Sequence, residues 1–124
     1  MNKLKKLVFS SCALIAIIGS SAAYAGSTTV TIGYYDTGKD SSVYSMSGNL
    51  SLTGYNSAQS TNQLWVELYR RDAGFDDRMT YKKMSIDSTT SWAYNANSAQ
   101  YYLHLDPDGP NYDSTIGSGS VTWP

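Results

Sequence analysis

Apolar residues occur along this 124-residue chain in short runs, in which apolar and polar side chains alternate. Such alternation is typical of strands that bury one face, because successive side chains of a strand point to opposite sides. Ser, Thr, Asn and Gly separate the runs at intervals of about ten residues. Six or seven strands are therefore predicted, with the shortest run the least defined, at 28–35, 43–53, 64–71, 80–86, 91–94, 99–105 and 115–123.

One side of each run is apolar, and we expect that side to face the core. The alternation is clearest at 64–71, where Leu64, Val66 and Leu68 form the inward set. Gly48 interrupts 43–53 and indicates a bulge or a break in that strand. The other residues predicted to face inward are Val30, Ile32, Leu50, Leu52, Met84, Ile86, Tyr101, Leu103, Leu105, Val121 and Trp123.

The segment around Trp65 allows a helix as the alternative. Ser60 and Gln63 have the spacing of a capping box, in which two side chains close the first helical turn. We favour a strand, because antiparallel pairing with 80–86 satisfies the apolar and the polar face in one register. The predicted cross-strand pairs are Leu64 with Ile86, Val66 with Met84, Glu67 with Lys83, and Tyr69 with Tyr81.

Short strands separated by frequent turn signals favour two packed antiparallel layers over a helical or an alternating α/β plan. The sequence therefore predicts an all-β fold, a single antiparallel β-sandwich of about seven strands. A small β-barrel is the runner-up, since closing the same strands into a ring would also bury one face of each.

The N-terminal segment 1–25 has the three parts of a secretory signal peptide: a basic start at 3–6, an apolar run at 7–19 and small residues at 23–25. The apolar run of 13 residues is shorter than the roughly 20 that span a bilayer, which argues against an uncleaved anchor. We expect removal of this segment and a secreted, extracellular product. That product would be a single all-β domain at 26–124 without a membrane span.

Composition excludes several classes of protein. The only cysteine, Cys12, lies in the predicted signal peptide, so neither a disulfide framework nor a cysteine-built metal cluster is expected. Three of the nine basic residues also lie there, which leaves six against ten acidic residues and a net charge of about −4. Nucleic acid is excluded as a partner, because phosphate binding needs a net basic surface.

Catalytic residues form no recognisable set. His104 is the only histidine and lies on the predicted outer face of its strand, while Glu67 is the only glutamate. No serine stands in a nucleophile-elbow pattern, and the aspartates fall mostly in turns. We therefore expect a protein that is not an enzyme and that needs no cofactor.

A polar loop near the C-terminus contains a candidate calcium site. Its oxygen-bearing side chains are Asp106, Asp108, Asn111 and Asp113. Calcium prefers such oxygen ligands, although the spacing is not that of a helix-loop-helix calcium site. A polar turn is the simpler interpretation, because Asp, Asn, Pro and Gly favour turns for backbone reasons.

Basic residues concentrate in one hairpin, which contains Arg70, Arg71, Arg78, Lys82 and Lys83. This hairpin could contact an anionic surface such as a wall polymer or a lipid headgroup. Acidic residues are interleaved with the basic ones and nearly neutralise them, so a solvated face is the simpler interpretation.

Aromatic residues are unusually frequent, and several lie on faces that alternation assigns outward. The candidate binding residues are Trp65, Tyr69, Tyr81 and Tyr102, together with Phe75 at the centre of the predicted hairpin tip 72–78. Aromatic rings with a polar tip supply rigid contact area and hydrogen bonds, as recognition surfaces require. Packing is the alternative, because Tyr and Trp favour strands and a loop can cover an outward ring.

These observations favour a secreted, non-catalytic binding or interaction module for a cell-surface polysaccharide or an extracellular protein. A small secreted antagonist, either a bacteriocin-like antimicrobial or an enzyme inhibitor, is the first alternative. An extracellular matrix protein that assembles through unpaired strand edges is the second.

Overall fold

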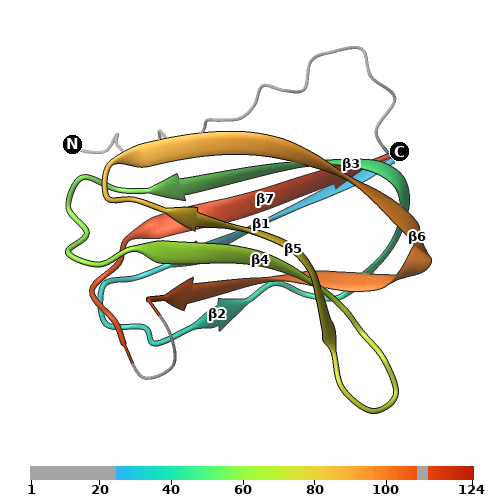
Figure 1. Ribbon diagram of the computed structural model, residues 1–124, viewed down its shortest axis with the longest axis horizontal. Coiled ribbons are helices and arrows are strands. Elements are labelled where there is room, and N and C mark those ends of the chain that lie inside the picture. Colours follow the sequence, from blue (N-terminus) through green and yellow to red (C-terminus); the bar gives the residue numbers. More distant parts are fainter. Residues whose placement is uncertain (1–24, 109–111) are drawn as a thin grey trace.

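The computed structural model describes residues 25–108 and 112–124, and these residues form an all-β fold with one seven-stranded antiparallel sheet (Figure 1). No helix occurs among the described residues, and so none that is long and apolar enough to cross a membrane. The strands are β1 (Gly26–Ile32), β2 (Lys39–Asp40), β3 (Tyr44–Asn56), β4 (Leu64–Arg70), β5 (Asp77–Met84), β6 (Ser88–Pro107) and β7 (Gly117–Trp123). The predicted all-β class is confirmed.

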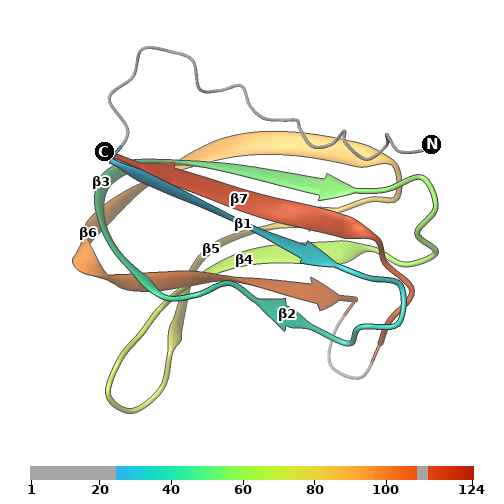
Figure 2. The same ribbon diagram turned by 180° about the vertical axis from the view of Figure 1, so that it is seen from behind.

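Strand β6 joins the two layers of the fold. Its residues 88–101 pair with β3, whereas residues 101–107 pair with β4, and β2 pairs with His104 and Leu105. The strand order is β1-β7-β3-β6-β4-β5, so one continuous sheet folds over along β6 and encloses the core (Figures 1 and 2). The sandwich is therefore a single sheet folded back on itself.

The expectation of two strands at 91–94 and 99–105 was wrong, because both belong to the 20-residue strand β6. The polar stretch between them keeps its pairing with β3 through a register shift between Met46 and Gly48. Gly48 has a φ of 88°, which only glycine adopts easily, and the predicted bulge at this position is confirmed. The two-residue strand β2 was not predicted, since two residues show no alternation.

The core contains the predicted inward residues with two exceptions. Ile86 follows the end of β5 and is 43% exposed, and Trp123 is only partly buried. Met46 and Ala96 join the core from the two strands that meet at the bulge. The residues that were predicted inward and are buried are Val30, Ile32, Leu50, Leu52, Leu64, Val66, Leu68, Met84, Tyr101, Leu103, Leu105 and Val121.

Glycine allows the two layers to approach each other closely. A Cβ atom on Gly119 of β7 would lie 2.9 Å from Val66 Cγ1 of β4 and 3.1 Å from Leu105 Cδ2 of β6. A Cβ atom on Gly54 of β3 would likewise lie 3.1 Å from Val66 Cγ2. The aliphatic side chains of β4 thus pack against bare backbone of β7 and β3.

The segment around Trp65 is a strand, as predicted, but its register with β5 differs from the predicted one by two residues. Leu64 rather than Val66 lies opposite Met84, and Trp65 lies opposite Lys83. A second register shift, between Leu68 and Tyr69, adds one residue on β5. A shift of two residues preserves the inward and outward faces, which is why the facing was right although the predicted pairs were wrong.

Candidate binding surface

The outer side of β4, β5 and the second half of β6 carries an ordered grid of aromatic and charged side chains. Cross-strand pairing sets these outward residues in three rows. The rows are Lys83, Trp65 and Asp106; Tyr81, Glu67, His104 and Asp40; and Arg78, Tyr69 and Tyr102. The four aromatic residues predicted to point outward therefore share one surface, which we call the aromatic face: Trp65, Tyr69, Tyr81 and Tyr102.

The aromatic face consists of two contacting ring pairs. The rings of Trp65 and Tyr81 have centroids 5.3 Å apart with an interplanar angle of 32°. The rings of Tyr69 and Tyr102 are stacked, with centroids 5.6 Å apart and an angle of 12°. Contact between two aromatic rings contributes favourable energy beyond that of the surface area it buries, and it holds both rings in place. The four rings consequently hold fixed positions on this surface.

Two cations cover the Trp65 and Tyr81 pair. The Arg78 guanidinium lies 4.0 Å from the Tyr81 ring centroid and 5.7 Å from that of Trp65. The Lys83 ammonium lies 5.2 Å from the Trp65 centroid. These distances are within the range of attraction between a cation and the face of an aromatic ring.

Glu67 lies at the centre of the grid, and it is 4% exposed although it is on the outer side of β4. Arg78 Nη1 donates a hydrogen bond of 2.8 Å to Glu67 Oε2. This hydrogen bond raises the pKa of the Arg78 guanidinium. Arg78 thus contacts both the Glu67 carboxylate and the ring of Tyr81.

The tyrosines of the second ring pair are neutral hydrogen-bonding groups. Burial, followed by the nearby Glu67 carboxylate, raises the pKa of Tyr69. Burial, followed by a hydrogen bond to Asp76, raises the pKa of Tyr102. The Tyr102 hydroxyl donates that hydrogen bond at 2.6 Å to Asp76 Oδ2 and ties the sheet to the β4–β5 connection. Neither phenol loses its proton at physiological pH.

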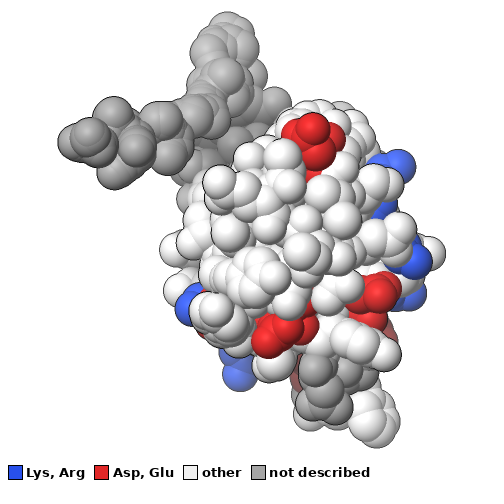
Figure 3. Space-filling model, turned by 90° about the vertical axis from the view of Figure 1, so that its left-hand side faces the viewer, with Lys and Arg blue, Asp and Glu red and all other residues white. Residues whose placement is uncertain are grey.

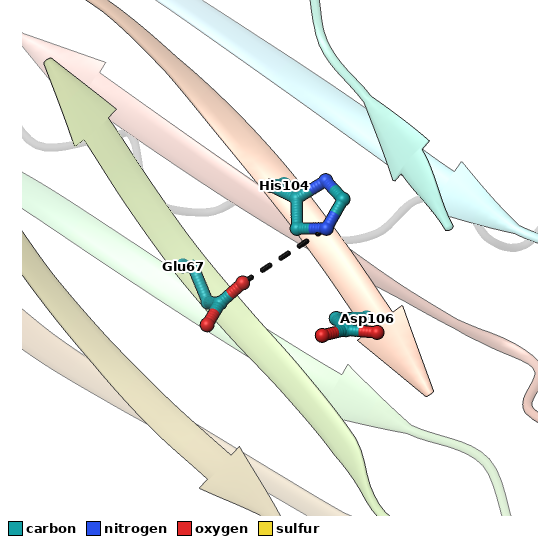
Figure 4. A group of neighbouring side chains, drawn as sticks. All are labelled: Glu67, His104 and Asp106. Carbon is teal, nitrogen blue, oxygen red and sulfur yellow. Dashed lines mark ion pairs between the residues drawn. The ribbon is translucent and has the colours of Figure 1, made fainter. Parts of the chain in front are cut away.

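His104 and Asp106 occupy the β6 side of the grid beside Glu67 (Figure 4). His104 Nδ1 hydrogen-bonds to Asp40 Oδ1, and its Nε2 lies 4.0 Å from Glu67 Oε1. Burial raises the pKa of the Asp106 carboxyl, an effect that His104 partly offsets. This group was not found from the sequence, because nothing in the pattern indicates that 64–71 pairs with 99–105.

Phe75 lies in the β4–β5 connection, which projects from the sheet (Figure 1), and its side chain is 88% exposed. Arg70 Nη2 holds the base of this connection through hydrogen bonds of 3.2 Å to Asp72 and 3.0 Å to Asp77. An open pocket of about 270 Å³ lies where the connection meets β2 and β6. It is lined by Asp40, Ser41, Val43, Arg71, Asp76 and Tyr102.

The residues of the predicted calcium loop have different surroundings. Asp106 belongs to β6 and joins the grid, whereas Asp113 Oδ1 accepts a hydrogen bond of 2.7 Å from Ser114 Oγ. Asp108 follows the end of β6 with a φ of 44°. Asn111 lies outside the described residues. The calcium site stays a prediction.

Two of the five basic residues of the hairpin, Arg70 and Arg78, form ion pairs with acidic residues. Arg70 pairs with Asp72 and Asp77, and Arg78 pairs with Glu67. At the end of the molecule that Figure 3 shows, Lys and Arg lie mainly along the margins and most of the surface carries no charged residue. A large basic patch is therefore not seen on that end.

Comparison with known proteins defines the class of fold. The sequence matches no protein-family model and no curated protein sequence. A crystal structure of PirA is similar, with a TM-score of 0.52, 14% identity, and coverage of 86% of this chain and 99% of that chain. A crystal structure of the Yersinia pseudotuberculosis-derived mitogen YPM has a TM-score of 0.42, 15% identity, and coverage of 79% of this chain and 83% of that chain. The likeness to PirA shows a shared all-β fold.

Proposed function

We propose that this chain is a secreted, non-catalytic binding module that uses the aromatic face to bind an extracellular protein. The observation that carries the proposal is the arrangement of Trp65, Tyr69, Tyr81 and Tyr102 as two ring pairs on one outer sheet surface. Export rests on the signal-peptide pattern of 1–25. Residues 1–24 lie outside the described residues.

The contacts of the rings favour a protein over a polysaccharide as the partner. Sugar recognition by stacking needs a free ring face, but Arg78 lies over Tyr81, and Trp65 is flanked by Tyr81 and two cations. Trp, Tyr and Arg are the residue types that contribute most to binding at protein interfaces. Their grouping here resembles the centre of such an interface more closely than it resembles a sugar platform.

Catalysis forms no part of the proposed function. The Tyr69 and Tyr102 phenols have raised pKa values and stay protonated, so neither is a base at neutral pH. One oxygen of the Glu67 carboxylate is held by Arg78. The surface offers hydrogen-bonding and stacking groups for recognition.

A pull-down tests this function. The purified protein, immobilised through a C-terminal tag, is incubated with culture supernatant and with solubilised envelope fractions. We expect the immobilised protein to retain another protein from these fractions. This retention should be lost when the fractions are treated with protease and should persist after periodate oxidation of their sugars. Retention with the opposite sensitivities would identify a polysaccharide partner and contradict the proposal.

Matched variants locate the binding surface in the same assay. Trp65→Ala combined with Phe75→Ala removes one ring of the aromatic face and the exposed ring of the loop, and we expect at least a tenfold loss of retention. Tyr35→Ala is the control, because Tyr35 is 84% exposed and lies between β1 and β2. Full retention by the double variant would place the binding site elsewhere.

Two further assays separate the alternatives named from the sequence. A growth-inhibition spot test would give a cleared zone for an antimicrobial antagonist and none for a binding module. Size-exclusion chromatography at rising concentration would show growing assemblies for a matrix protein that pairs through its outer strands β1 and β5.

A further inference from the structure

We propose that Glu67, His104 and Asp106 (Figure 4) form a binding site for a divalent transition-metal ion of the Zn²⁺ type. The site lies on the outer sheet surface, among the rings of the aromatic face. Each residue offers one ligand atom, and the three atoms lie within 4.8 Å of one another. The site is distinct from the calcium loop predicted from the sequence, with which it shares only Asp106.

The backbone places the three ligands in fixed positions. Glu67 and His104 are direct cross-strand partners, and Asp106 lies two residues further along the same face of β6. Tetrahedral Zn²⁺ with bonds near 2.0–2.1 Å holds its ligand atoms about 3.3 Å apart. His104 Nε2 and Glu67 Oε1 are 4.0 Å apart, so small side-chain rotations bring them to that separation.

The second nitrogen of His104 is already held in the orientation that metal binding requires. Asp40 on β2 hydrogen-bonds to Nδ1, so Nε2 is the ring nitrogen that faces the side where Glu67 lies. Metal-binding histidines commonly have a carboxylate on the other ring nitrogen, which fixes the ring and its tautomer. Asp40 would serve as that positioning residue.

The charges around the site favour a dication. Glu67 Oε2 is held by Arg78, so Oε1 is the oxygen that is left for a metal. No hydrogen bond or ion pair reaches the Asp106 carboxyl from the part of the chain that the structure describes. The carboxylates of Glu67, Asp106 and Asp40 and the guanidinium of Arg78 together carry a net charge of about −2, which a dication would balance.

The donor set indicates the class of metal. One imidazole and two carboxylates suit Zn²⁺ and related transition ions, whereas Ca²⁺ takes six to eight oxygen ligands. Three protein ligands leave a fourth position open to water or to an atom of a bound molecule. The Tyr69 ring lies edge to face with His104, with centroids 5.9 Å apart, and forms one wall of the site.

Calorimetric titration of the purified protein without the predicted signal peptide, residues 26–124, with Zn²⁺ alone tests the proposal, and it needs no protein partner. We expect one Zn²⁺ per chain. Asp106→Asn should weaken binding at least tenfold, because it removes a charged ligand. Asp108→Asn is the matched control from the same acidic stretch and should bind within about twofold of the wild type.

A second variant keeps the test decisive if Asp106→Asn alters the fold. Asp40→Asn leaves all three ligands in place and should weaken Zn²⁺ binding about tenfold, because it releases His104. Its melting temperature without metal should match that of the wild type. Nitrogen NMR of His104 should report the Zn²⁺ at Nε2. Absence of binding to the wild type, an equal loss in Asp108→Asn, or tighter binding of Ca²⁺ than of Zn²⁺ would overturn the proposal.

Discussion

Glu67 organises the surface of this protein at the scale of single residues. Its carboxylate lies on the outer side of a strand, yet it is nearly buried, with Arg78 on one oxygen and His104 facing the other. Alternation identified it correctly as an outward residue. It could not reveal the burial, because that depends on Tyr81 and His104, which flank Glu67 on the two neighbouring strands.

Removal of Arg78 should destabilise the fold. Arg78→Ala leaves the buried Glu67 carboxylate without its hydrogen-bond donor, and we expect the free energy of unfolding to fall by about 1–3 kcal/mol. Urea denaturation followed by tryptophan fluorescence measures the change. Arg71→Ala is the control, because Arg71 is an exposed arginine with no ion pair to any described residue, and it should change stability by less than about 0.5 kcal/mol.

Part of the candidate site could be predicted from single residues of the sequence. The four outward aromatics follow from alternation alone. Trp65 and Tyr102 each lie between two inward residues of their strand. Tyr69 and Tyr81 lie an even number of residues from the other outward residues of their strands. The group of Glu67, His104 and Asp106 does not follow, because it is created by the pairing of β4 with β6. That pairing joins segments far apart in the chain and has no local signal.

At the scale of elements, the strands were more predictable than their connections. The facing of β1, β3, β4 and β7 was right because burial of one face imposes a period of two. The predicted register of β4 with β5 was wrong, because a shift of two residues preserves that period. The alternation also gives no sign of the local register shift between Leu68 and Tyr69. Strand β6 was divided at 95–98, because a single apolar residue in that stretch, Ala96, shows no alternation, although it is buried in the core.

Close contact between the layers gives a prediction about glycine. Gly119→Ala should place its Cβ 2.9 Å from Val66 Cγ1, and we expect a loss of about 1–3 kcal/mol in the free energy of unfolding. Gly74→Ala is the control, since its Cβ would meet nothing within 4 Å. Adding Val66→Ala to Gly119→Ala should recover part of the loss relative to the sum of the single changes, which a double-mutant cycle in urea would show. Strict additivity would contradict the packing of β7 on β4.

At the scale of the whole molecule, one folded sheet separates two kinds of surface. The layer of β4, β5 and the end of β6 turns the aromatic face outward, while the opposite layer of β1, β7 and β3 carries mostly Ser, Thr and single tyrosines on its outer side. The first described residues lie beside the C-terminus, where the Ala25 N–H donates to the Trp123 carbonyl at 2.7 Å (Figure 2). A C-terminal tag would thus leave the aromatic face open.

The most direct measurement compares two tyrosines of similar exposure on opposite layers, using the protein that the pull-down retains. Tyr81 on the aromatic face is 44% exposed, and Tyr55 on β3 is 41% exposed. We predict that Tyr81→Ala weakens the affinity for that protein at least tenfold in surface plasmon resonance, and that Tyr55→Ala leaves it within twofold. Equal affinities for Tyr81→Ala and the wild type, or a larger loss for Tyr55→Ala, would contradict the assignment of binding to the aromatic face.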